Sequence, residues 1–188
     1  MSYKLVKLNN KYKKVYNIIC KNLPNSIFNK LGFNFFKKLA LEKIIHIYCV
    51  KKNSKLSAII TVMDYENYKT IDKQVLKYLI IKPFKLINIF LDLKKSISKT
   101  SKFRVKKNYL HLLHLIIFKN HFLNISLEKK NRMFDNFYKK ILKYHKSKIL
   151  FLCFEEDNKK AKNYYLRNKF KFFYKIGNII YFKKIFKI

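Results

Sequence analysis

The stretch that decides the fold is residues 157–170, which read DNKKAKNYYLRNKF. It comes shortly after residues 149–154, a run of mostly apolar residues that predicts a buried strand. Asp157 or Asn158 suits the N-cap of a helix, because a short polar side chain accepts a hydrogen bond from the first helical turn. The stretch therefore predicts a strand that leads into a capped helix over residues 159–168.

The elements around this stretch complete the second half of the chain. Residues 109–118 are its most hydrophobic segment and predict a buried central strand. A long helix is expected over residues 127–145, because apolar residues recur on one face: Leu127, Phe134, Phe137, Tyr138, Ile141 and Leu142. Residues 171–174 and 178–186 predict a final strand pair that turns at Gly177. The predicted order is β-α-β-α-β-β.

The first half of the chain predicts a strand, two helices and a hairpin, in the order β-α-α-β-β. These elements are expected at residues 3–8, 11–21, 35–45, 46–51 and 55–64. We expect Leu39 and Leu41 to point inward from the second helix. The pair Asn53 and Ser54 is expected to form the hairpin turn.

The middle of the chain is apolar and rich in lysine. Residues 72–93, interrupted by Pro83, predict two short helices, and the polar residues 94–107 predict a loop. No internal repeat is visible. The whole sequence predicts one α/β domain with a mixed central sheet and helices on both faces.

The charge of the chain is extreme, with a formal net charge of +34. Its arginines are only Arg104, Arg132 and Arg167, whereas proteins that recognise phosphates and base edges favour arginine for its planar guanidinium. The abundant residues, Lys, Asn, Ile, Phe and Tyr, are those of A+T-rich codons, so we attribute the charge to codon bias. We expect weak, salt-sensitive and non-specific binding to polyanions.

Other classes of function find little support. Cys20, Cys49 and Cys153 are scattered without metal-ligand spacing and are expected to be free thiols in a reducing compartment. The sequence shows no Gly-rich nucleotide loop, no Ser-His-Asp pattern and no cluster of His and Cys, so no metal is expected. No apolar run approaches the roughly 18 residues that a membrane span requires, and we expect a cytoplasmic protein.

The pattern in residues 158–170 resembles the end of the GNAT acetyltransferase core. There a strand is followed by Asn-x-x-Ala-x-x-aromatic-Tyr and then, four and five residues on, by Gly-Phe. The residues at these spacings are Asn158, Ala161, Tyr164, Tyr165 and Phe170. Lys169 stands at the glycine position and departs from the family pattern.

This resemblance implies roles for three residues of the helix. Tyr165 would protonate the departing thiolate of coenzyme A, which a phenol with an ordinary pKa near 10 can do at neutral pH. Asn158 would contact the acyl-CoA arm, and Ala161 would be small where the helix passes that arm. A helical tyrosine is also commonly a half-buried core residue, which is the alternative interpretation of Tyr165.

GNAT proteins bind the pyrophosphate of coenzyme A at the N-terminus of the helix that follows the central strand, through a Gln/Arg-x-x-Gly-x-Gly/Ala loop. The matching stretch is His121, Phe122, Leu123, Asn124, Ile125 and Ser126, which contains no glycine. Asn124 tolerates a positive φ, and Ser126 is a good N-cap, so we predict a degenerate loop. In a competing register, residues 122–127 are the strand and no phosphate loop exists.

The resemblance also implies how the domain is organised. Residues 1–68 would form the substrate side, residues 69–108 an insertion, and residues 109–188 the acyl-CoA-binding core. The strand ending near Phe118 and the strand at residues 149–154 should part to admit the pantetheine arm. The backbone of Ile116, Ile117 and Phe118 would hold that arm and polarise the thioester carbonyl.

The predicted function is transfer of an acetyl group from acetyl-CoA to a primary amine by direct attack. Two alternatives remain: a GNAT-shaped binding module without catalysis, and a basic protein that associates with nucleic acid or anionic membrane through residues 72–107.

The sequence leaves the general base of this reaction open. His111 and His114 are both candidates, and on a regular strand they would face opposite sides and could not share a metal. Glu155 and Glu156 are expected to be solvated carboxylates.

Overall fold

The computed structural model describes residues 3–24, 26–67, 70–71, 73–75, 77 and 109–188. These residues form a seven-stranded sheet in the order β1-β2-β3-β4-β5-β7-β6. Only β4 and β5 pair in parallel among the described strands. The strands are β1 (Tyr3–Lys7), β2 (Ile45–Lys52), β3 (Lys55–Asp64), β4 (Tyr109–Ile117), β5 (Ile149–Glu155), β6 (Lys171–Ile176) and β7 (Ile179–Ile185).

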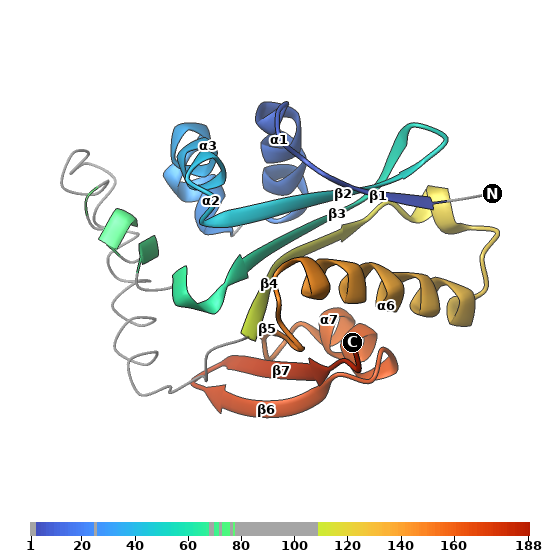
Figure 1. Ribbon diagram of the computed structural model, residues 1–188. Helices are drawn as coiled ribbons and strands as arrows, with labels where there is room; N and C mark the ends of the chain where they lie inside the picture. The colour runs from blue at the N-terminus through green and yellow to red at the C-terminus, as the bar shows by residue number, and fades with distance from the viewer. Residues whose placement is uncertain (1–2, 25, 68–69, 72, 76, 78–108) are drawn as a thin grey trace.

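Helices cover both faces of this sheet (Figure 1). One face carries α1 (Tyr12–Asn22), α2 (Ile27–Leu31) and α3 (Phe33–Leu41). The other face carries α6 (Leu127–Tyr144) and α7 (Lys159–Arg167), and short 3-10 turns η1 (Tyr65–Asn67) and η3 (Lys119–Phe122) follow β3 and β4. The predicted α/β fold with helices on both faces is confirmed.

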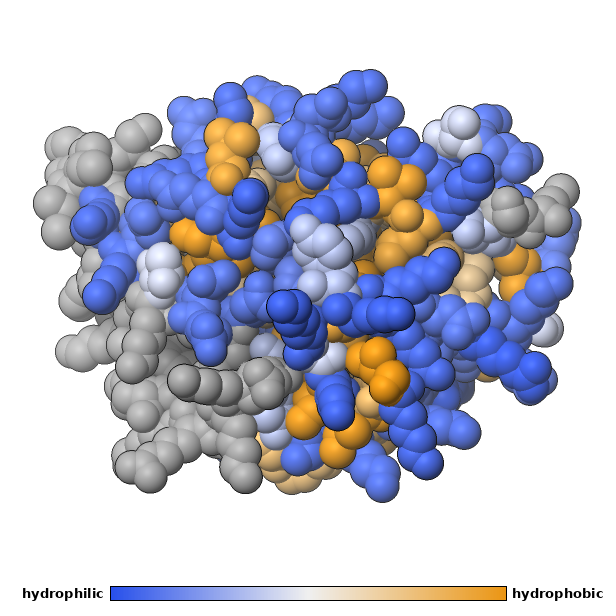
Figure 2. Space-filling model, viewed as in Figure 1, coloured by the Kyte–Doolittle hydropathy of each residue, from blue (hydrophilic) through white to orange (hydrophobic). Residues whose placement is uncertain are grey.

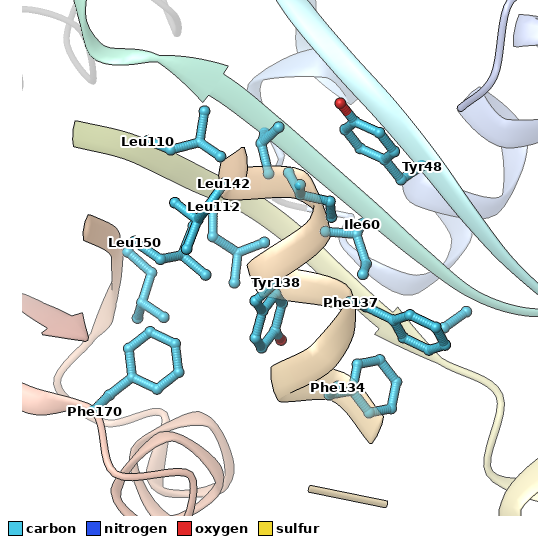
Figure 3. Close-up of a cluster of buried hydrophobic side chains, with 14 of the residues drawn as sticks. Tyr48, Ile60, Leu110, Leu112, Phe134, Phe137, Tyr138, Leu142, Leu150 and Phe170 are labelled. Carbon is cyan, nitrogen blue, oxygen red and sulfur yellow. The ribbon is translucent and has the colours of Figure 1, made fainter. Parts of the chain in front are cut away.

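Period-two alternation along the strands divides the apolar residues between two cores. Under α6, the side chains of Phe134, Phe137 and Tyr138 pack against sheet residues that include Ile60 and Leu112 (Figure 3). Burying one such side chain contributes about 1.5–3 kcal/mol. The other face buries Ile19 of α1, Leu31 of α2 and Phe36 of α3 in a second cluster.

The order of the described elements agrees with the sequence analysis except for α2, a short helix that was not predicted. Two buried positions were also predicted wrongly. The predicted helix over residues 35–45 is shorter, because Lys43 adopts a φ of 57° and Ile45 already begins β2. Leu41 is therefore at the end of α3 and exposed, whereas Leu39 is buried as predicted. Leu127, the first residue of α6, is also exposed, whereas Phe134 on the same helix is buried.

Both predicted hairpins are confirmed. Asn53 and Ser54 take φ values of 47° and 62°, the backbone of a tight turn between β2 and β3. Gly177, with a φ of 58°, lies in the turn between β6 and β7. The predicted helices at residues 72–93 lie mostly, and the loop at residues 94–107 entirely, outside the described residues.

The surface shown in Figure 2 is largely hydrophilic, with small separate hydrophobic areas. This agrees with the 44 basic residues of the sequence. Within the described part of the chain, none of the helices combines the length and hydropathy of a membrane-spanning helix.

Candidate active site

Strands β4 and β5 are hydrogen-bonded only at their beginnings. The parallel pairing joins Tyr109 with Ile149, Leu110 with Leu150, and His111 with Phe151. Beyond His111, β4 continues along β3, while β5 continues along β7. Among the described residues, the edge of β4 that faces β5 therefore has no strand partner from Leu112 to Ile117. The predicted parting of the two strands is confirmed.

The residues predicted to hold the pantetheine arm lie at the end of β4. Ile116 is buried on the α1–α3 face, and Ile117 is packed against the α6 core. Phe118 is already engaged, since its N–H donates to the carbonyl of Ser57 at 3.0 Å and its carbonyl accepts from His121 N–H at 3.0 Å. Of the three, Ile116 and Ile117 thus remain the better candidates for backbone contacts with a ligand.

The segment after β4 is fixed to the sheet. The hydroxyl of Tyr3 in β1 donates to the carbonyl of His121, and the Ser57 hydroxyl lies 3.1 Å from His121 Nδ1. Phe122 is buried, stacked on the ring of Tyr3 at a centroid distance of 5.1 Å. Phe122 lies in η3, so the competing register that made residues 122–127 a strand is wrong.

The loop ends in a capped helix N-terminus. The Ser126 hydroxyl accepts the N–H of Lys129 at 3.3 Å, and Ser126 is the N-cap of α6 as predicted. The N–H groups of Leu127 and Glu128 have no acceptor among the described residues, as is usual in a first helical turn. These N–H groups and the helix dipole make this end of α6 suitable for an anion.

Asn124 does not adopt a positive φ. The residues of the described chain with positive φ do not include Asn124, so its tolerance of that conformation does not explain the missing glycines. Leu123 and Asn124 are instead exposed residues between η3 and α6, and Ile125 is half-buried, with its N–H directed to the carbonyl of Phe122. The loop lacks glycine because its backbone does not need one.

Helix α7 has the boundaries that the motif predicts. The Asn158 side chain caps the helix by accepting the N–H of Ala161 at 3.0 Å. At the other end, Phe170 N–H donates to the Tyr165 carbonyl at 3.0 Å and Lys169 N–H to the Leu166 carbonyl at 2.9 Å. These two hydrogen bonds together form a Schellman motif, which requires a left-handed residue after the C-cap.

Lys169 is that left-handed residue, with a φ of 61°. A non-glycine residue in this conformation costs roughly 1–2 kcal/mol. The helix end that the family makes with glycine is therefore retained in spite of the substitution. Phe170 is buried, and its ring packs edge-on against the ring of Tyr165. This contact helps to fix the orientation of Tyr165.

Tyr165 is half-buried among aromatic rings. Its ring is stacked on Phe154 of β5 at a centroid distance of 5.9 Å and lies edge-on to Tyr164. Burial, and to a lesser extent the neighbouring Tyr164 and Cys153, raise the pKa of the Tyr165 phenol above its usual value. The phenol is thus protonated throughout the neutral range, the state that a proton donor needs.

The two histidines of β4 lie on the same face of the sheet, contrary to the prediction. A bulge at Leu113 shifts the register, so that Thr61 pairs with His114 and Met63 with His111. Burial lowers the pKa of His111 to about 3, with a contribution from His114, and that of His114 to about 4. Both are weak bases at neutral pH.

The partners of these histidines are inside the protein. His111 stacks on Phe151 at 4.4 Å, with its Nε2 3.8 Å from Cys153 Sγ. His114 Nε2 is 3.2 Å from the Ser26 hydroxyl, the N-cap of α2. Glu155 and Glu156 are exposed as expected, and Glu156 is paired with Lys175.

The sequence analysis missed one cluster of histidine and carboxylate side chains. His46, Asp64 and His145 bring one ligand atom each within 4.8 Å of one another. The sequence analysis considered only clusters of histidine with cysteine and did not consider this combination. Positions 46, 64 and 145 lie too far apart in the sequence to form a recognisable motif, and only the pairing of β2 with β3 and the end of α6 join them.

Solved acetyltransferase structures match nearly the whole chain. The Campylobacter jejuni N-acetyltransferase PseH in complex with acetyl coenzyme A has a TM-score of 0.56 at 12% identity, covering 98% of this chain and 99% of that one. The Thermoplasma acidophilum PaiA N-acetyltransferase in complex with coenzyme A has a TM-score of 0.55 at 14% identity, covering 99% and 100%.

A GNAT-family acetyltransferase from Listeria monocytogenes has a TM-score of 0.57 at 11% identity, covering 97% of this chain and 94% of that one. No family model and no curated protein matches the sequence. The chain therefore has the fold of the GNAT acetyltransferases, with the helix end at Lys169 and the helix N-terminus at Ser126 in the places that the motif predicts.

Proposed function

We propose that this protein transfers an acetyl group from acetyl-CoA to a primary amine. The observation that carries the proposal is the placement of Tyr165 on α7, beside the strand that parts from β4. A fold alone does not imply an activity, but this side chain occupies the position that the motif assigns to the proton donor.

Residues of the α6 N-terminus fit the anionic part of acetyl-CoA. The free N–H groups of Leu127 and Glu128, behind the Ser126 cap, are proposed to bind the pyrophosphate with the backbone of His121 to Ile125. The unpaired edge of β4 at Ile116 and Ile117 is proposed to hold the pantetheine amides as a strand would. Ala161 leaves room beside the arm, and Asn158, whose Oδ1 caps α7, would contact it through the amide nitrogen.

In the proposed reaction the amine nitrogen bonds to the thioester carbonyl carbon and the carbon–sulfur bond breaks. The departing sulfur takes the proton of the Tyr165 hydroxyl, and the nitrogen gives up its own proton to solvent. The Tyr165 phenolate then takes a proton back from solvent. No covalent bond to the protein forms. His111 and His114 are unsuited to accept the proton of the amine, because their lowered pKa values make them weak bases.

Acetyl transfer tests this proposal. The protein is incubated with acetyl-CoA and separately with amines of different class: an amino sugar, a lysine peptide, a peptide with a free N-terminus and a polyamine. We expect one class to gain 42 Da, about the mass of an acetyl group, by mass spectrometry with rates far above those of heat-denatured protein. Binding of acetyl-CoA with no transfer to any class would instead support a non-catalytic binding module.

A further inference from the structure

A cluster of three side chains lies under the C-terminal end of α6, on the sheet face that α6 covers. His46 is the second residue of β2, Asp64 ends β3, and His145 is the C-cap of α6. We propose that His46, Asp64 and His145 form a binding site for a divalent transition-metal ion of the zinc class.

The distances between the donor atoms suit one ion. His145 Nδ1 lies 3.1 Å from Asp64 Oδ2, and His46 Nε2 lies 3.4 Å from the same oxygen. The three ligand atoms all lie within 4.8 Å of one another. In a tetrahedral zinc site with ligand bonds of about 2.0–2.1 Å, neighbouring donors are about 3.3 Å apart. The two imidazole rings, with centroids 4.4 Å apart, both converge on this carboxylate. A water molecule would complete the fourth position.

The donor set selects the class of metal. Two imidazole nitrogens and one carboxylate oxygen are the ligands of zinc and of related first-row ions, whereas magnesium and calcium prefer oxygen alone.

A second layer of contacts orients one ligand. The Tyr48 hydroxyl lies 3.0 Å from His145 Nε2, the ring nitrogen that does not face Asp64. Metal-binding histidines usually have such a partner on the other ring nitrogen, which fixes the tautomer. With Nδ1 directed to the metal, His145 Nε2 would carry the proton and donate it to the Tyr48 hydroxyl oxygen.

The position of the cluster favours a cation and gives it access. The C-terminal end of α6 carries the negative end of the helix dipole. The side chains of His145 and His46 are 4% and 10% exposed, while that of Asp64 is 36% exposed and opens the cluster to solvent. An ion bound here would join β2, β3 and α6, and would stabilise the fold by binding only the native state.

Cobalt titration tests the site without assuming any enzyme activity. Protein freed of metal by chelation is titrated with Co2+, which absorbs visible light strongly in tetrahedral sites. We expect saturation at one ion per chain, without the near-ultraviolet thiolate band that binding at Cys153 would give. Zinc should displace the cobalt and raise the unfolding temperature, and a chelator should reverse the rise.

Three variants test whether the cobalt absorption comes from His46, Asp64 and His145. Asp64→Asn should weaken cobalt binding by more than the 10–100-fold typical of an outer contact, and Tyr48→Phe should weaken it within about that range. His121→Gln, which removes a histidine outside the cluster, should bind as the unaltered protein does. A titration without one-ion saturation, or equal binding in Asp64→Asn, would show that the three side chains form only a hydrogen-bonded group. If Asp64→Asn does not fold, unchanged binding in Tyr48→Phe overturns the proposal equally.

Discussion

The two ends of helix α6 differ in the sign of the charge that they suit. At the N-terminal end, Ser126 caps the helix, and the N–H groups of Leu127 and Glu128 have no acceptor in the part of the chain that the structure describes. At the C-terminal end, His145 converges with Asp64 and His46 on a point that suits a cation. The helix dipole favours this arrangement at both ends.

The two ends also differ in how they are assembled. The proposed anion site is made by consecutive residues, whose backbone forms one loop. The proposed cation site is made by side chains from two strands and one helix, joined only when the sheet pairs. A site made of backbone should tolerate changes in sequence, whereas a site made of side chains depends on each residue.

The largest expected effect is on turnover and concerns Tyr165, which lies at neither end of α6. Tyr165→Phe removes the proton donor and retains the ring that packs on Phe154 and Phe170. We expect turnover to fall about 10²–10⁴-fold, the usual contribution of a positioned general acid. The affinity for acetyl-CoA should hardly change, since the lost interaction acts in the transition state. Steady-state kinetics and a binding titration measure the two quantities.

The neighbouring Tyr164→Phe variant is the matched control. The hydroxyls of Tyr164 and Tyr138 lie near each other and are buried, but neither has a hydrogen-bond partner of good geometry among the described residues. Removal of the Tyr164 hydroxyl should therefore change the free energy of unfolding and the turnover rate very little. If Tyr165→Phe keeps most of its turnover, Tyr165 is a core residue and not the proton donor. The assignment of the fold would not change.

Much of the fold and of the acyl-CoA side was predictable, because each element carries its own local signal. The Asn158 cap, the strand at Ile149 and the helix end at Phe170 all follow from spacing along a few turns of chain. The α6 N-terminus is local in the same way. These features depend on residues that are neighbours in the sequence.

The errors arose where a distant part of the fold decides the outcome. The bulge at Leu113 is a property of the β3–β4 pairing, and it turns His111 and His114 to one face. Leu41 is apolar but lies where α3 ends and the chain turns toward β2. The cluster of His46, Asp64 and His145 depends on the packing of three elements, for which no local pattern exists.

Mild acid should destabilise the domain, because His111 and His114 are buried in the neutral form. The pKa values of His111 and His114, about 3 and 4, lie below the value of about 6.5 in an unfolded chain. As the pH falls below about 6.5, the unfolded chain takes up these protons and the folded chain does not. Each histidine then lowers the free energy of unfolding by up to about 1.4 kcal/mol per pH unit.

Urea unfolding between pH 7.5 and 5 measures this loss. His111→Asn should reduce the slope by about half, and a free energy of unfolding that stays constant over this range would contradict the burial of both imidazoles. The contribution of Asp64 has a different window: its lowered pKa stabilises the fold above about pH 4 and is lost only as the pH falls further. Metal binding is therefore best compared above pH 7.

The smallest expected effect concerns the cap of α6. Ser126→Ala should lower the free energy of unfolding by about 1 kcal/mol, because Lys129 N–H loses its acceptor. It should also weaken acetyl-CoA binding, since the first turn becomes less ordered. Ser26→Ala is the matched control, as Ser26 caps α2 on the other face and should reduce stability alone. Equal acetyl-CoA affinity in both variants would remove the α6 N-terminus from the proposed site.

Calorimetric titration with acetyl-CoA at physiological salt tests the central claim most directly. Because a chain of net charge +34 binds many polyphosphates, ADP and tripolyphosphate are titrated under the same conditions. The account predicts one saturable acetyl-CoA site per chain, with clearly higher affinity than either control and a smaller dependence on salt. Tripolyphosphate binding that equals acetyl-CoA binding at every salt concentration would contradict it and reduce the interaction to charge alone.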